Sequence, residues 1–193
     1  MSESTLITVV SGLPRTGTSM MMQMLAAGGC KILADTLRPP DASNPHGYFE
    51  FEPVKRLPLD SSWLPQARGQ AVKVVAPLLR YLPLAAGDGS PLEYRVVFMR
   101  REWDEVAASQ SRMLENLGLA HAEQPKPELR SGMLHLEAVA LAWLAENRVP
   151  TLEIDYRQTL ANPAATAAKL ASLLPGLATL PAAAAVQQRE GPP

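Results

Sequence analysis

The sequence is poor in several features, and each shortage excludes a class of protein. Cys30 is the one cysteine among 193 residues, so an intrachain disulfide framework is excluded, and we interpret this residue as an inert thiol. A formal net charge of −1 gives no overall electrostatic basis for binding nucleic acid or an anionic membrane. No apolar run approaches the length of a membrane span, and the polar start MSEST is unlike a signal peptide. We therefore expect a cytoplasmic protein with no nucleic-acid partner and no membrane span.

The bulk composition favours one globular domain. Hydrophobic residues make up 47% and charged residues 19% of the chain, and this length is typical of a single core. We interpret residues 1–193 as one domain. After Pro175 the chain becomes rich in proline and alanine and then polar, which predicts a loose tail from about residue 181.

Short buried strands alternate with helices along the chain. Strands are predicted at 6–11, 72–76, 95–99 and 151–155, and helices at 18–27, 102–117, 129–147 and 163–174. In the second helix the apolar stripe begins at Val106, and Ser109 is assigned to the opposite, polar side; in the third, Leu134, Ala138, Leu141 and Leu144 are assigned to the core. The alternation predicts an α/β fold with a central, mainly parallel sheet of four to five strands between helices.

The segment SGLPRTGTSMMMQML, at 11–25, has the skeleton of a phosphate-binding loop between a strand and a helix. Backbone N–H groups of such a loop converge with the positive end of the following helix on one anion. The lysine that binds triphosphate after the second glycine is absent, because Thr18 stands there, and Arg15 supplies a cation earlier. We therefore predict a site for one terminal anionic group rather than for a magnesium triphosphate. A glycine turn before an ordinary helix is the alternative.

The loop resembles that of a known family. GLPRTGTS is similar to the 5′-phosphosulfate loop of the sulfotransferases that use 3′-phosphoadenosine 5′-phosphosulfate (PAPS), whose usual form is P-K-S-G-T-T/S. Arg for Lys and Thr for Ser are departures within the same chemistry, although the two cations are not equivalent donors. The resemblance implies a P-loop-NTPase-like three-layer sandwich and PAPS as cofactor. It implies that the cofactor is bound by Pro14, Arg15, Thr16, Gly17, Thr18 and Ser19.

Further stretches extend the resemblance over about residues 6–174. In RVVFMRREWDEVAASQ, Arg101 and Ser109 match the pair that holds the 3′-phosphate in this family, whereas a solvated pair at a helix start is the alternative. The adjacent Arg100 is the alternative for the role of Arg101, and strand alternation predicts that only one of the two side chains faces the site. Tyr156, after a strand, matches a tyrosine that borders the adenine; a half-buried strand-end tyrosine is the alternative. The family's C-terminal R-K-G stretch has at most a remnant here, QREG at 188–191.

The resemblance also implies a reaction, namely transfer of a sulfuryl group to a hydroxyl or amine without a metal. Arg15 and Lys73 are predicted to stabilise the developing charge. Val75 stands where cytosolic members have a histidine base. We predict Glu50 as the base instead, with Glu52 and His46 as further candidates and an exposed loop acid as the alternative for Glu50.

Two other functions remain open from the sequence. The first is a nucleotide or small-molecule kinase with a degenerate P-loop, which binds ATP and magnesium and for which Asp155 is a possible metal-binding acid. The second is a relative that binds nucleotide without turning it over. The acceptor of a transferase is expected to be a small molecule, glycan or peptide. The loops 36–48 and 118–128 are expected to shape the pocket that binds it. With 3 Trp, 4 Tyr and 3 Phe, a cavity for flat phenols is not favoured.

Overall fold

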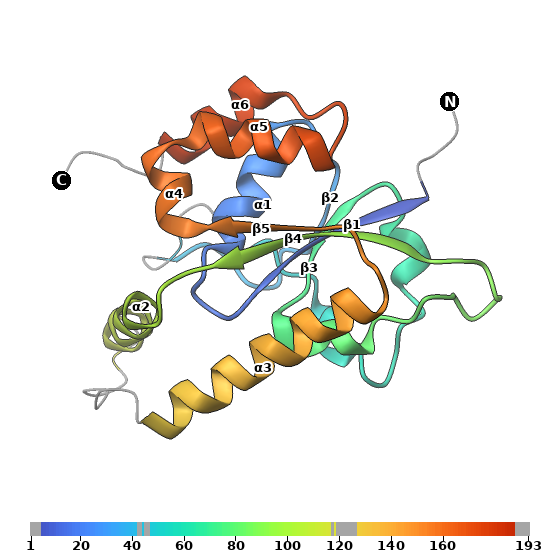
Figure 1. The fold of residues 1–193 in the computed structure, drawn as a ribbon, viewed down its shortest axis with the longest axis horizontal. Helices are drawn as coiled ribbons and strands as arrows, with labels where there is room; N and C mark the ends of the chain where they lie inside the picture. The colour runs from blue at the N-terminus through green and yellow to red at the C-terminus, as the bar shows by residue number, and fades with distance from the viewer. Residues whose placement is uncertain (1–4, 42–43, 45–46, 117, 119–126, 188–193) are drawn as a thin grey trace.

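The strands form one parallel sheet with the first strand in its centre. The computed structural model describes residues 5–41, 44, 47–116, 118 and 127–187. Within them the sheet has five strands in the order β2-β3-β1-β4-β5, and every neighbouring pair is parallel (Figure 1). The strands are β1 (Leu6–Gly12), β2 (Ile32–Leu33), β3 (Ala71–Lys73), β4 (Glu93–Arg100) and β5 (Thr151–Asp155). The predicted sheet is therefore confirmed, with β2 as an unpredicted edge strand.

Helices cover both faces of this sheet, as the three-layer prediction requires. Figure 1 shows one face covered by α1 (Thr18–Ala27), α4 (Tyr156–Ala161), α5 (Pro163–Leu173) and α6 (Thr179–Gln187). The other face carries α3 (Pro127–Glu146) and the 3₁₀ turns η1 (Glu52–Arg56), η2 (Leu64–Ala67) and η3 (Ala76–Tyr81). After β4, helix α2 (Trp103–Asn116) begins at the carboxyl end of the sheet. That end also carries the loop after β1, where ligands bind in open α/β sheets.

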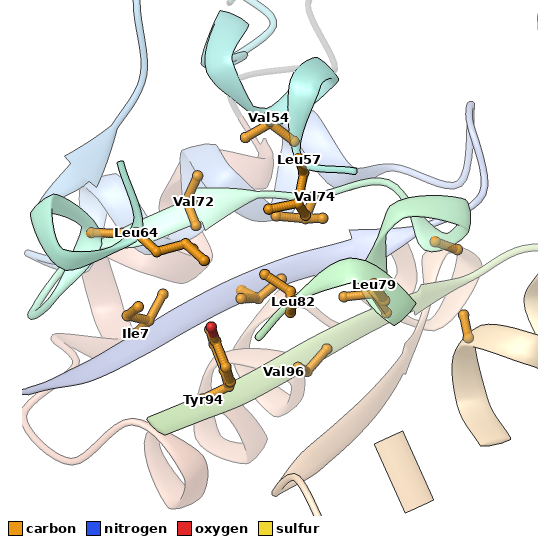
Figure 2. Close-up of a cluster of buried hydrophobic side chains, with 14 of the residues drawn as sticks. Ile7, Val54, Leu57, Leu64, Val72, Val74, Leu79, Leu82, Tyr94 and Val96 are labelled. Carbon is orange, nitrogen blue, oxygen red and sulfur yellow. The ribbon is translucent and has the colours of Figure 1, made fainter. Parts of the chain in front are cut away.

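Apolar residues on the two faces form two cores. Figure 2 shows the core under the 3₁₀ turns, where Ile7, Val72 and Val96 of three adjacent strands meet turn residues such as Leu57 and Leu79. The other core packs the methionines of α1 against α5 and α6. Met20, Met21, Met22 and Met24 are at most 1% exposed. The methionine stripe is therefore core filling, as predicted.

The chain beyond residue 180 differs from the prediction of a loose tail. Residues 181–187 belong to α6, which packs on α1 and α5, and Ala182 and Val186 are buried. Small alanine side chains let this helix lie close to its neighbours. The alanine-rich stretch that was predicted to be loose is therefore a packed helix. Residues 188–193 lie outside the described part of the chain.

Two helices depart in part from their predicted stripes. In α3, Leu141 and Leu144 pack in the core as predicted, whereas Leu134 is 44% exposed, Ala138 is exposed and the unpredicted Glu137 is buried. In α2, Ser109 is buried beside Val106, one turn away, and not on the polar side. No helix of the described chain has both the length and the apolar character that a membrane crossing needs.

Candidate functional site

The loop after β1 is held in its shape by two glycines. Gly12 has φ 145° and Gly17 has φ 96°, values that residues with a Cβ rarely adopt. A Cβ on Gly12 would lie 2.7 Å from the carbonyl oxygen of Met99, and one on Gly17 would lie 2.5 Å from the ring of Tyr156. The loop therefore lies against β4 and α4 at distances that only glycine permits.

The N-terminus of α1 opens towards a cavity. Gly17 is its N-cap residue, no side chain of the described chain caps it, and its first turn has no acid. Thr18 and Ser19 line a cavity of about 420 Å³ at this point. An uncapped helix end with its positive dipole facing a polar cavity is the arrangement that binds anions.

Most of the predicted site residues meet in this cavity. They are Pro14, Arg15, Gly17, Thr18, Ser19, Glu50, Lys73, Arg101, Ser109 and Tyr156. Thr16 is the exception, since it is 1% exposed and its hydroxyl donates to the carbonyl oxygen of Leu13 at 2.7 Å. Its backbone N–H is bound to the same carbonyl at 3.3 Å, so both donors of Thr16 shape the loop, and its predicted cofactor contact stays a prediction.

Lys73 approaches the cavity from β3. Side chains alternate along a strand, and Val72 and Val74 pack into the core under the 3₁₀ turns, so Lys73 points to the α1 side. Its Nζ donates to the carbonyl oxygen of Tyr48 at 2.8 Å and to Ser19 Oγ at 3.2 Å. The side chain is 9% exposed, so its charge acts in a poorly hydrated setting beside the N-terminus of α1.

Arg15 extends to the opposite side of the cavity. Its backbone is left-handed, with φ 71°, and its Nε donates to Ser109 Oγ on α2 at 3.1 Å. A second nitrogen, Nη1, lies 3.7 Å from the sulfur of Met113, one turn further along α2. Arg15 and Ser109, which the sequence analysis assigned to opposite ends of the cofactor, are therefore in direct contact.

Arg101 lies beside Arg15 and is held on three sides. Its Nη1 donates to the carbonyl oxygen of Arg15 at 3.1 Å, and its guanidinium lies 4.0 Å from the centroid of the Tyr156 ring. Nε faces Glu105 Oε2 at 3.5 Å without a hydrogen bond. A hydrogen bond from Arg157 to the other oxygen of Glu105, together with the charge of Arg101, lowers the pKa of this carboxyl.

Arg100 points away from the cavity, so only one of the two arginines faces it, as strand alternation predicted. It forms ion pairs with Glu153 at 2.8 Å and with Glu137 at 3.2 Å. Arg101 is therefore the one of the two arginines that lines the site.

Part of the cavity lining comes from the segment between β2 and η1, whose Arg38 and Tyr48 were not predicted as site residues. Arg38 donates to Glu50 at 2.8 Å and lies over the Tyr48 ring at 3.4 Å from its centroid. The Tyr48 phenol donates to Asp41, and burial followed by this bond raises the pKa of Tyr48. Glu50 Oε1 lies 3.9 Å from Lys73 Nζ, which places the predicted base next to the predicted cation.

Asp35 forms hydrogen bonds to both ends of this segment. Its N–H donates to the carbonyl of Glu50 at 2.8 Å, and its carboxylate accepts from the N–H of Glu52 at 2.5 Å and of Leu37 at 3.0 Å. The two ends of the 36–51 segment are thus held together, and its described residues Arg38, Asn44, Tyr48 and Glu50 line the cavity. Of the missed residues, Met113 is the one with a sequence signal, since it lies one helical turn after Ser109.

The other acid candidates lie elsewhere. The Glu52 carboxylate pairs with Lys55 at 2.6 Å and does not line the cavity, so its interpretation as a base is wrong. Asp155, considered as a metal ligand, caps α4 by accepting the N–H of Gln158 at 2.8 Å. His46 and the QREG stretch at 188–191 lie outside the described residues. Within the described chain no three His, Cys, Asp or Glu side chains gather in a way that could hold a metal ion.

Comparison with known proteins gives no family for the chain. No family model and no curated protein matches it. Among solved structures, one neighbour is the unliganded crystal structure of a sugar kinase from Janibacter sp. HTCC2649, which is 13% identical, covers 90% of this chain and 96% of its own, and has a TM-score of 0.46.

Proposed function

We propose that the chain is a PAPS-dependent sulfotransferase. One observation carries the proposal: a single cavity joins an uncapped helix N-terminus, with Lys73 beside it, to a second cationic group around Arg101. A ligand with anions at both ends, such as a nucleotide with a 5′-phosphosulfate and a 3′-phosphate, matches this arrangement. The absence of the triphosphate lysine at Thr18 agrees with it.

The residues divide the binding between them. The N–H groups that begin α1, together with Ser19 and Lys73, bind the phosphosulfate. Arg101 and Ser109 bind the 3′-phosphate, the former through the forked contact that phosphates favour. Tyr156 supports the Arg101 guanidinium by cation–π contact and offers its ring edge to the adenine.

Transfer requires charge stabilisation and a base. PAPS supplies a sulfuryl group whose bond to the bridging oxygen breaks as the acceptor oxygen or nitrogen forms a new bond to sulfur, and adenosine 3′,5′-bisphosphate leaves. Lys73 stabilises the negative charge that grows on the bridging oxygen, and Ser19 donates a hydrogen bond to the phosphate. Glu50 accepts the proton from the acceptor, because it is the carboxylate among the described residues that line the cavity.

A kinase is the second candidate, and Ser19 favours it. Its hydroxyl lies next to Lys73, whose amine in turn lies near Glu50, so a hydroxyl, an amine and a carboxylate lie close together at the N-terminus of α1. A triphosphate site uses these three groups for magnesium and the terminal phosphates. The two candidates make opposite predictions about ligands.

Adenosine 3′,5′-bisphosphate is expected to raise the melting temperature, and ATP with magnesium is expected to leave it unchanged. A ligand at one hundred times its dissociation constant stabilises the folded state by about 2.7 kcal/mol. The measurement is a thermal melt with each ligand over a concentration series, with adenosine as the uncharged control. Stabilisation by ATP with magnesium alone would replace the sulfotransferase proposal with the kinase one.

Glu50→Gln is expected to spare binding of the bisphosphate and to lower turnover by about 10²–10⁴-fold, the usual contribution of a general base. Turnover is measured as PAPS consumption with the best acceptor from a panel of alcohols, phenols and amines. Glu52→Gln is the matched control, since Glu52 is two residues away and paired with Lys55 outside the cavity. Unchanged turnover in Glu50→Gln removes the base assignment, and tight bisphosphate binding without transfer by the unmodified chain indicates a non-catalytic relative.

A further inference from the structure

The cations of the cavity form two separate groups. Lys73 bonds to Ser19 and to the carbonyl of Tyr48, on the α1 side. Arg15 bonds to Ser109, and Arg101 bonds to the backbone of Arg15, on the α2 side. The resemblance implied that Arg15 works with Lys73 at the transferred group, whereas the side chain of Arg15 contacts Ser109 and Met113 of α2.

The backbone explains why Arg15 joins the α2 group. A left-handed residue directs its side chain differently from a residue in the usual helical or extended regions, and Arg15 has φ 71°. Its carbonyl is fixed at the same time by the hydrogen bond from Arg101. The guanidinium is then anchored at Ser109 Oγ and Met113 Sδ, both on α2. Backbone and side chain of Arg15 are thus both committed to the α2 side.

We infer that Arg15 binds the 3′-phosphate of the nucleotide and not the group that is transferred. The inference rests on the proposed function. Arg15 and Arg101 lie side by side, and two guanidinium groups provide enough N–H donors for a dianionic phosphate. The Ser109 hydroxyl, which accepts from Arg15 Nε, keeps its own hydrogen to donate to the same phosphate. Arg15 is then a specificity residue that selects nucleotides phosphorylated on the 3′-hydroxyl.

Lys73 becomes the cation of the transferred group. It is the remaining lysine or arginine of the described cavity lining apart from Arg38, which bonds to Glu50. The two ends of the ligand are therefore recognised by independent groups, and removing one group should leave recognition of the other end intact.

Calorimetric titration of Arg15→Ala with two ligands tests this division. Adenosine 3′,5′-bisphosphate is expected to bind about 10–100-fold more weakly than to the unmodified chain, as for loss of hydrogen bonds to a charged group. Adenosine 5′-monophosphate, which lacks the 3′-phosphate, is expected to bind with unchanged affinity. Lys73→Ala is the matched control and is expected to weaken both ligands by the same factor.

Arg15→Gly guards against a folding artefact, because glycine accepts φ 71° without strain and removes the same guanidinium. Equal losses for both ligands in Arg15→Ala and Arg15→Gly, or no loss for either, overturn the inference. If Arg101→Ala removes the preference for the bisphosphate while Arg15→Ala keeps it, the inference fails and the proposed function stands. If the unmodified chain binds neither nucleotide, both fail.

Discussion

Gly17→Ala is expected to abolish nucleotide binding and to lower the free energy of unfolding by about 2–5 kcal/mol, from strain and overpacking together. Gly17 has φ 96°, and a Cβ there would lie 2.5 Å from Cδ2 and 3.1 Å from Cε2 of Tyr156. The ring cannot move freely, because the Arg101 guanidinium lies over it at 4.0 Å. One methyl group would therefore displace the aromatic ring and the arginine that it supports.

Urea unfolding and bisphosphate titration measure the two effects. Gly29→Ala is the matched control, since Gly29 has φ 91° at the other end of the same helix and no atom within 4 Å of a Cβ. The control carries the backbone strain alone, about 1–2 kcal/mol, and is expected to bind nucleotide normally. Equal destabilisation of the two variants, with binding retained in both, would show that the contact with Tyr156 is unimportant.

Lys73→Met is expected to lower turnover by about 10²–10³-fold, the usual effect of losing one group that stabilises transition-state charge. Methionine keeps an unbranched stem of similar length but has no charge. The arginines of the described cavity cannot substitute, because Arg15 is anchored at Ser109 and Arg38 at Glu50. The developing charge would then rest on the N-terminus of α1 and Ser19 alone.

The control for this variant is Lys55→Met, which removes a lysine that is 60% exposed and paired with Glu52. Lys55→Met is expected to keep full turnover, since exposed ion pairs contribute little. Rate constants are compared at saturating PAPS, so that weaker binding does not appear as slower chemistry. A loss of less than tenfold in Lys73→Met would move the charge-stabilising role to another residue.

The elements that carry a strong pattern were predictable from the sequence. The expected helix at 18–27 and strand at 151–155 match α1 and β5 residue for residue, because glycines flank the helix and apolar residues alternate with polar ones along the strand. The edge strand β2 has two residues, too few to show any periodicity. The strand expected at 72–76 ends at Lys73, although Val74 still donates its N–H to Val10 at 3.0 Å, and the 3₁₀ turn η3 takes up the chain from Ala76 with Pro77 in its first turn.

The buried acid of α3 was missed for an electrostatic reason. A helix pattern assigns charged residues to solvent, yet Glu137 is 8% exposed. Its carboxylate lies 3.2 Å from Arg100, and burial still raises the pKa of Glu137 above its ordinary value. Hydrophobic periodicity has no means of predicting a buried acid that a distant strand residue neutralises.

The parts of the site that depend on local sequence were predictable, and the contacts between distant elements were not. The loop follows β1, Lys73 is the last residue of β3 and Arg101 follows β4, so their convergence at one edge of the sheet follows from parallel topology. The contact between Arg15 and Ser109 depends on one left-handed residue and on how α2 packs. Neither property is written in a motif, which is why the two residues were assigned to different ends of the ligand.

The hydrogen bonds of Asp35 hold the two ends of the 36–51 segment together. Both ends are hydrogen-bonded to one aspartate, so the residues between them form a closed loop. The entropic cost of closing such a loop grows only slowly as residues are added to it. The length of the span between these two ends can therefore vary at little entropic cost while the hydrogen bonds of Asp35 stay in place.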